Sequence, residues 1–493
     1  MAKELSNGYY EIRKACLEHT CPVEARCNYI KKATSRVIAA VFNAQFSDPS
    51  KSPVPKDLQQ LVLEDLKVSA SYSKCRRAMA KATDDLFGSN EDLYDQLAEY
   101  LHLLKLANPD TVTDIKTEIE EDGTERFLYT FLAFGASIQG FSKLRRVLVV
   151  DGTHLTDSEN DDSWTWFFEK LERIIADSNT LTIISDRCQS IYVAKNRVFP
   201  RAHHGACIVH LARNVNAKFH NKGLAKLVTN AAYAYTVGSF RTIYGQIRGK
   251  NIEWDRYNLM TSNIAESLNK ALWKGRASPI VELLKFIRAM LTRWFSARRK
   301  KSATHNGVVT PEVDKQLTKN MSIVNGNKVA TVTSWSYEIV GLFNGKHHVL
   351  LDLKKCTCKH YDRVKIPCEH AMLAANHQGI PPTTLVDKYY KTSTWAATYA
   401  GEINPEVHTN DIGMADEVVR RDLIPPKSRR PSGRPTKSRI PSVGEYPVSL
   451  IYIFDNRISV SHSSDHVLTC SLIDFRNLQR ALSKLIGVQD ASR

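Results

Sequence analysis

The spacing of apolar residues separates helical from strand-like segments along the chain. Between residues 58 and 126 apolar residues recur every three or four positions, as in DLYDQLAEYLHLLKL, and this spacing predicts a helical region. RVLVV and LTIIS are instead short apolar runs, which predict buried strands. The helical spacing of SWTWFFEKLERII lies between them, so we expect the two strands to pair in parallel.

The pattern changes twice more toward the C-terminus. Helical spacing prevails from residue 210 to residue 299, and a period of two then returns in SYEIVGLF and KHHVLLDL, which predicts a β-hairpin. Beyond Tyr390 the chain becomes polar. The stretch PPKSRRPSGRPTKSR is typical of an unfolded segment.

Length and charge narrow the class of protein. A chain of 493 residues is expected to hold two to four folded units. Its net charge of +16 favours a polyanionic partner, whose binding should weaken as salt is added. No apolar run approaches the roughly 18 residues that span a bilayer, so no membrane partner is expected. The N-terminal MAKELSNGYYEIRK lacks the apolar core of a secretory signal, so the cysteines are expected to be reduced and to favour metal over disulfides.

The densest candidate chemistry is the stretch CTCKHYDRVKIPCEH. Its first two cysteines end a predicted strand, where residues two apart share a face, and its last cysteine and histidine open a predicted helix. Three thiolates and one imidazole can form a closed tetrahedron around a structural zinc ion. The competing interpretation is three buried thiols and a surface histidine. We predict that the zinc ligands are Cys356, Cys358, Cys368 and His370.

The C-x-C…C-x-H pattern resembles the SWIM zinc finger, and in particular the one near the C-terminus of Mutator-like element (MULE) transposases. Upstream, VLVVDGTHL, SENDDSWTWFFEKL, LTIISDRCQSI, VFPRAHHGACIVHLARN and SNIAESLNKAL resemble successive sequence blocks of that family. The resemblance implies an RNase H-like core with a catalytic DDE triad. Such a triad has three carboxylates because phosphoryl transfer with two Mg²⁺ or Mn²⁺ ions needs them to hold the metals. Carried over, the triad is Asp151, Asp186 and Glu266.

Two weaker metal candidates also come from the resemblance. Cys207 and His210 match a C-x-x-H that the family shares, and His203 or His204 can join them as ligands. A core cysteine beside a hydrogen-bonded histidine explains that motif equally well. His19 and Cys21 match two ligands of the zinc-binding DNA-recognition domain that opens these transposases.

One interval departs from the family pattern. Asp151 and Trp164 are 13 positions apart, whereas the family carries a two-stranded hairpin between these points. Thirteen residues are too few for two strands of ordinary length and their turns. The VLVV strand is then expected to be an apolar sheet edge. A misplacement of about 1 Å can lower a catalytic rate about 100-fold, so we expect impaired cleavage.

The basic C-terminal stretch is a candidate DNA contact. Gly433-Arg434-Pro435 resembles the core of a minor-groove binder, with the neighbouring basic residues on phosphates. A solvated linker or a nuclear import signal is the alternative, and the expected location is the nucleus. The candidate DNA-binding residues are Lys427, Arg429, Arg430, Arg434, Lys437 and Arg439.

These patterns, together with the family resemblance, predict an α/β plus α multidomain protein, and the resemblance implies that its RNase H-like core lacks a β-hairpin. The expected regions are an N-terminal zinc-type DNA-binding remnant (1–38), a helical region (58–126), an RNase H-like transposase domain with a helical insertion (127–320), a SWIM zinc finger (331–390) and a mostly disordered basic tail (391–493). The expected function is that of a transposase-derived protein that binds zinc and DNA. An active transposase that cuts and joins terminal inverted repeats, and a truncated product in which only the zinc finger folds, remain alternatives. Homo-oligomerisation is left open.

Overall fold

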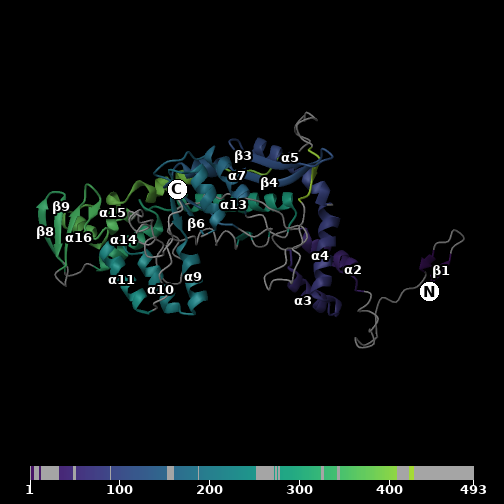
Figure 1. Cartoon of the computed structure of the whole chain (residues 1–493), viewed down its shortest axis with the longest axis horizontal. Helices are drawn as coiled ribbons and strands as arrows, with labels where there is room; N and C mark the ends of the chain where they lie inside the picture. Colours follow the sequence, from purple (N-terminus) through teal and green to yellow (C-terminus); the bar gives the residue numbers. More distant parts are fainter. Residues whose placement is uncertain are drawn as a thin grey trace, which may run out of the picture.

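The computed structural model describes residues 2–4, 10–12, 33–47, 52–88, 90–152, 160–186, 188–250, 271–272, 275, 278–323, 327–340, 345–407 and 421–426. The chain is elongated in Figure 1, with the N-terminal strands and helices toward one end of the long axis and strands β8 (Lys328–Thr333) and β9 (Ser336–Val340) at the other. No helix in these ranges is long and apolar enough to cross a membrane.

The N-terminal helices form a unit with a core of its own. Side-chain caps start two of them, because Thr34 accepts a hydrogen bond from the amide of Val37 and Ser71 accepts one from Lys74. Ile38, Leu58 and Cys75 are completely buried at the centre of this unit. Its elements are α2 (Ser35–Phe42), η2 (Asn43–Phe46), α3 (Pro55–Leu66) and α4 (Tyr72–Phe87), preceded by the short pair β1 (Ala2–Glu4) and β2 (Tyr10–Ile12).

The region 58–126 is only partly helical, which corrects the prediction. After α5 (Asn90–Ala107) the chain forms an antiparallel hairpin of β3 (Val112–Ile119) and β4 (Glu125–Ala133). The β-branched run TVTDIKTEI favours a strand, and Asp122-Gly123 supplies the turn, with Gly123 at φ 86°. Both signals are local, so the sequence itself indicates this hairpin.

A three-stranded parallel sheet follows, as the strand–helix–strand pattern predicted. Its strands lie in the order β5-β6-β7 and all run in the same direction. Phe167, Phe168 and Leu171 of the intervening helix α7 pack against this sheet and against β4. The elements are α6 (Gly135–Phe141), β5 (Val147–Val149), α7 (Asp161–Glu172), β6 (Thr182–Ser185), α8 (Gln189–Val198) and β7 (His203–Ala206).

Helices dominate the next part of the chain, in agreement with the helical spacing. α9 (Ile208–Phe219), α10 (Lys222–Ala232) and α11 (Val237–Lys250) surround a separate small core. The long helix α13 (Ile280–Ala303) buries Leu284 and Ile287 against the elements around α5. The helix α14 (Pro311–Ile323) then leads to an antiparallel sheet.

A four-stranded antiparallel sheet follows α14, and it includes the predicted hairpin. Its order is β11-β10-β9-β8, and one face is covered by α16 (Figure 1). Its elements are β8 (Lys328–Thr333), β9 (Ser336–Val340), β10 (Lys346–Leu350), β11 (Lys355–Cys356), α15 (His360–Val364), α16 (Glu369–His377), α17 (Pro382–Leu385) and η4 (Lys388–Tyr390).

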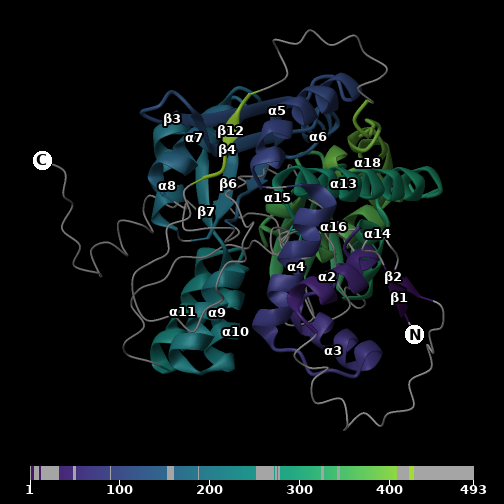
Figure 2. The same cartoon turned by 90° about the vertical axis from the view of Figure 1, so that its right-hand side faces the viewer.

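The fold continues beyond residue 390, so the predicted start of the tail at 391 is too early. α18 (Thr392–Thr398) buries Trp395, and Tyr399 and Ile403 join the same core as α5 and α13. A short strand, β12 (Leu423–Ile424), then pairs in parallel with β4 (Figure 2). The chain beyond residue 390 is polar on average, and the few apolar residues in its described part are the ones that pack. Residues 408–420 and 427–493 lie outside the described ranges.

Candidate metal centre and carboxylate pair

The four predicted zinc ligands converge at one point. The three cysteine sulfurs and one histidine nitrogen all lie within 4.8 Å of one another. Nδ1 of His370 is 3.8 Å from Sγ of Cys356 and 3.9 Å from Sγ of Cys368. Ligands of a tetrahedral zinc ion, at Zn–S about 2.3 Å and Zn–N about 2.0 Å, are about 3.5–3.8 Å apart. The cluster therefore has the size of a tetrahedral zinc site.

Local structure brings these ligands together from a strand and a helix end. Cys356 ends β11, and its amide donates a hydrogen bond to Oδ2 of Asp362 at 2.8 Å. Cys368 is the N-cap of α16, so His370 lies in the first turn of that helix. Lys359 and Lys365 adopt left-handed backbone conformations on either side of α15, which fold the connecting segment back on itself. The predicted positions of Cys356 on a strand and of Cys368 and His370 at the start of a helix are confirmed. Cys358 lies in the turn after β11 and not on the strand, which corrects its predicted position.

The chemistry of the donor set fits a dication. Hydrogen bonds from Cys358 and Cys368 lower the pKa of Cys356 to about 4, because they stabilise its thiolate. The same contacts, together with burial, raise the pKa of Cys368. The protein by itself thus favours a thiolate at Cys356 and a neutral thiol at Cys368. A zinc ion would allow all three thiolates at once, and four protein ligands would leave no position for a substrate.

A second histidine packs on the ligating one. The rings of His347 and His370 have centroids 3.9 Å apart at an angle of 31°. His347 belongs to β10, so this contact joins the sheet to the metal cluster. Burial lowers the pKa of His347, and the nearby His370 lowers it further. A neutral His347 ring therefore covers the centre on one side.

The two predicted catalytic aspartates follow neighbouring strands of the parallel sheet. Val149 of β5 is paired with Ile184 of β6, and Asp151 and Asp186 each come two residues later. The ladder extends to Val150, whose amide donates to the carbonyl of Ile184 at 2.7 Å. Adjacent strands lie about 4.8 Å apart, so the two residues end the same edge of the sheet side by side. Both side chains are half-buried.

Hydrogen bonds fix the turn that carries Asp186. Its Oδ1 accepts a hydrogen bond from the amide of Cys188 at 3.0 Å, which orients the carboxylate. The hydroxyl of Ser185 donates to the carbonyl of Asp186 at 2.8 Å and lies 2.9 Å from Nε2 of His204 on β7. Burial lowers the pKa of His204 to about 4, and the charge of Lys195 adds to this effect. The sequence indicates His204 only as a possible metal ligand, whereas the pairing of β6 with β7 places it against Ser185.

Cys207 and His210 have a different arrangement from a metal site. Cys207 is buried and caps α9, where its sulfur accepts a hydrogen bond from the amide of His210 at 3.4 Å. Within the described part of the chain, neither residue belongs to a group of three or more side chains that could hold a metal ion. This arrangement favours the structural interpretation of the motif.

Other candidates lie outside the described residues. These are the third carboxylate, Glu266, the N-terminal pair His19 and Cys21, and the six basic residues between 427 and 439. Residues 153–159, where the family hairpin would be inserted, lie outside as well. Among the described strands, β5 has one neighbour, β6, and its Val147 and Val149 are half-buried.

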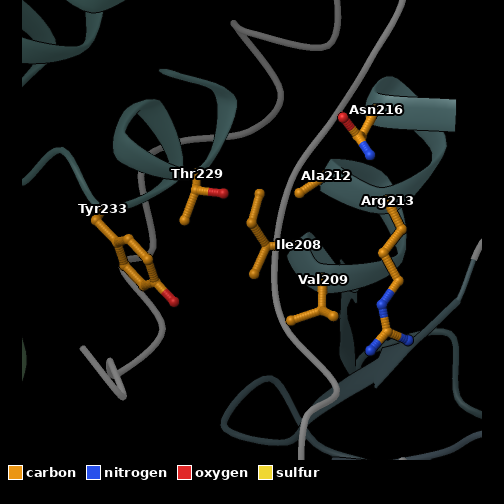
Figure 3. Close-up of a pocket in the computed structure, with 7 residues that line it drawn as sticks. All are labelled: Ile208, Val209, Ala212, Arg213, Asn216, Thr229 and Tyr233. Carbon is orange, nitrogen blue, oxygen red and sulfur yellow. The ribbon is translucent and has the colours of Figure 1, made fainter. Parts of the chain in front are cut away.

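A cavity of about 270 Å³ lies between α9 and the end of α10 (Figure 3). Its lining is mostly apolar, with Ile208 and Val209 on one side and Tyr233 on the other. Arg213 is the only charged residue of this lining. Asn216 and Thr229 add uncharged polar groups to it.

Fold and site together define an α/β protein with a separate Cys₃His metal-binding unit, and comparison with known families identifies both parts. A model of the MULE transposase domain matches residues 124–214, and a model of the SWIM zinc finger matches residues 347–379. The chain thus carries a MULE transposase domain followed by a SWIM zinc finger, which confirms the resemblance and supports zinc as the metal of the cluster. No curated protein matches the chain.

Proposed function

We propose that this chain is a transposase-derived protein that binds DNA and zinc, and that its ancestral DDE-type cleavage is impaired. The observation that carries the proposal is the equal register of Asp151 and Asp186 at the ends of two neighbouring parallel strands. Ligands of open α/β sheets collect at this edge. An RNase H-like core supplies its first two carboxylates in this way.

The aspartate pair suits Mg²⁺ or Mn²⁺. Carboxylate oxygens are the preferred ligands of these ions, and the hydrogen bond from Cys188 gives Asp186 a defined orientation. Asp151 and Asp186, with Glu266 as the third carboxylate, would hold the ions. When bound, such ions stabilise negative charge on the attacking and leaving oxygens of a phosphoryl transfer. His204 and Ser185 hold the strand end that carries Asp186.

Impairment is proposed because of the strand arrangement beside Asp151. The interval from Asp151 to Trp164 is too short for the hairpin that extends this side of the sheet in the family. β5 is accordingly the edge of the described sheet, in which it pairs with β6. An edge strand of three residues holds its carboxylate less rigidly than a central strand, and catalysis is sensitive to such displacements.

A DNA partner is proposed from charge. The net charge of +16 and the basic stretch at residues 427–439 supply cations for a phosphate backbone. A transposase ancestor also acts on DNA. A nuclear location follows from the same proposal.

The test incubates the full chain, loaded with zinc, with a labelled DNA duplex, a supercoiled plasmid and Mg²⁺ or Mn²⁺. Retention of the duplex at low salt without joining to the plasmid is expected for the wild type and for Asp186→Ala. The control is Asp65→Ala, which removes an exposed carboxylate of the N-terminal helices.

Two results would contradict parts of the proposal. Joining that needs the divalent ion, is lost in Asp186→Ala and persists in Asp65→Ala would establish an active transposase, the second candidate function. Absence of any duplex binding at low salt would refute the DNA-binding role.

A further inference from the structure

The zinc finger contacts the parallel sheet β5-β6-β7 through Arg145, which lies just before β5. Nη2 of Arg145 donates a hydrogen bond to the carbonyl of Val364 at 2.8 Å. The guanidinium of Arg145 also lies over the ring of Tyr390, 4.7 Å from its centroid. Arg145 is two residues before β5, and Val364 is the last residue of α15. A charge-assisted hydrogen bond and a cation–π contact therefore join the two units at this point.

The accepting carbonyl belongs to the segment that zinc closes. α15 lies entirely within the nine residues between the ligands Cys358 and Cys368. The carbonyl of Val364 accepts a second hydrogen bond, from the buried hydroxyl of Tyr390 at 3.0 Å. It lies at the C-terminal end of a helix, where carbonyl groups carry partial negative charge and suit a guanidinium. Its position depends on the fold of the segment that the metal holds together.

A second contact reaches the same short helix from the helical insertion. The rings of Tyr235 and His360, the first residue of α15, have centroids 4.9 Å apart. Tyr235 lies in the connection between α10 and α11, and it packs against the core that contains Val364 and Ile366. The closed metal segment thus contacts both the sheet and the insertion.

The strand that Arg145 leads into is paired on one side only in the described sheet. β5 is three residues long, its one neighbour in the described sheet is β6, and it ends two residues before Asp151. An edge strand of this kind frays easily, so an anchor at its start changes its stability appreciably.

We propose that zinc binding stabilises β5 through Arg145, so that the metal centre and the aspartate-bearing sheet are thermodynamically linked. Arg145 is then a positioning residue, because it acts on Asp151 only through the strand between them. The linkage itself is independent of DNA cleavage, and only its consequence for catalysis rests on the proposed function.

The linkage is tested by hydrogen exchange of the full chain, with zinc bound and after removal of zinc by a chelator. In the wild type, zinc removal is expected to speed exchange of the amides of residues 147–150 by about 10- to 100-fold, the factor that a hydrogen bond to a charged group is worth. The helices α2 to α4, which have their own core, are expected to exchange at an unchanged rate.

Two arginine variants separate this route from a general loss of structure. Arg145→Ala is expected to keep its zinc, to exchange faster at residues 147–150, and to show no further change when zinc is removed. Arg146→Ala is the matched control, because the guanidinium of Arg146 donates to the carbonyl of Ala176 at 2.7 Å, within the sheet domain. It should still respond to zinc removal like the wild type.

Three results would overturn the inference. The first is that zinc removal leaves the exchange of β5 in the wild type unchanged. The second is that Arg145→Ala responds to zinc removal as strongly as the wild type. The third is that zinc removal also lowers the protection of α2 to α4. The last would mean that zinc supports the whole chain without a specific route. None of these measurements requires DNA or a divalent ion at Asp151, so their failure is distinct from failure of the proposed function.

Discussion

Cys368 is the most deeply buried of the four zinc ligands. It is completely buried, whereas Cys358 is only half-buried, and its neighbouring sulfurs raise its pKa. A buried thiol of this kind has no favourable charged state without a cation. Burial of Cys356 and Cys368 therefore favours metal binding over thiol chemistry, which needs an accessible thiolate.

Cys368→Ser should abolish zinc binding. Loss of one of four direct ligands is expected to weaken zinc affinity by more than about 100-fold, the upper range for residues that only support a ligand. Zinc per chain, measured by elemental mass spectrometry, should fall from about one to near zero. Cys188→Ser is the control, since Cys188 is a half-buried free cysteine outside the cluster. Full zinc content in Cys368→Ser would refute the assignment.

His204 makes the stability of the sheet depend on pH. Its pKa is lowered from 6.5 to about 4 by burial and by Lys195, and Asp186 offsets this only in part. Between these values the unfolded chain binds a proton that the folded chain does not. Stability from this group is complete above pH 6.5 and decreases as the pH falls toward 4.

His204→Gln should remove this contribution while keeping an amide that can hydrogen-bond Ser185. We expect its free energy of unfolding to depend less on pH than that of the wild type between about pH 6.5 and 4. The difference in slope is at most about 1.4 kcal/mol per pH unit. Urea unfolding of both proteins over this range measures it. Parallel pH profiles would show that His204 does not titrate as described.

Among the elements, α6 and α18 are in very close backbone contact. A Cβ atom added to Gly140 of α6 would lie 2.5 Å from the carbonyl oxygen of Thr398 in α18. Gly401 is similarly close to α6, because its Cβ would meet that of Ala136 at 2.8 Å. Small residues therefore allow the segment after the zinc finger to reach the start of the transposase domain.

Gly140→Ala is expected to lower the free energy of unfolding by about 1–3 kcal/mol, since the helices must separate to admit a methyl group. Gly245→Ala in α11 is the matched control: its added Cβ meets nothing within 4 Å, so alanine should stabilise this helix by about 0.5–1 kcal/mol. Denaturant unfolding compares the two. Equal effects of both substitutions would contradict the close contact.

At the level of the whole molecule, residues that follow the zinc finger bond to elements that precede it in the sequence. Asn404 and Asn108 exchange two hydrogen bonds, of 2.7 and 2.9 Å, between backbone and side-chain groups. Arg126 donates to the carbonyl of Pro425 beside β12. The zinc finger is thus an insertion between two segments of one core, and it is not a terminal appendage.

The proposed DNA binding by the whole chain should depend strongly on salt. The excess of 68 basic over 52 acidic residues means that affinity comes largely from released counterions. For six to ten phosphate contacts, raising salt from about 50 to 200 mM should weaken binding about 10³- to 10⁵-fold. Fluorescence anisotropy of a labelled duplex measures this slope. A salt-independent affinity would exclude a phosphate-based interface.

The zinc site could be predicted in full because its information is local. Four ligands lie within fifteen residues, and the strand and helix that aim them have their own sequence signals. The two aspartates could be placed at strand ends for the same reason. Their common register could be expected from the strand–helix–strand pattern and from the family resemblance, and the pairing of β5 with β6 agrees with it.

The structure differs from the prediction in residues 112–126 and after residue 390, for two different reasons. The β3–β4 hairpin has a local signal in Asp122-Gly123 that the helical pattern before it obscured. α18 and β12 have no strong periodicity, and they fold because α5, α13 and β4 offer them apolar surface. Long-range packing of this kind leaves little trace in a short window of sequence.

The sequence by itself determined the zinc ligands and the order of strands and helices around the aspartates, because spacing within a few turns of chain encodes both. Only the tertiary structure decided that Arg145 meets Val364, which follows it by 219 positions, and that His204 supports the turn of Asp186. Such contacts depend on how separate elements pack, since the residues involved carry no pattern that distinguishes them from ordinary surface arginines and histidines.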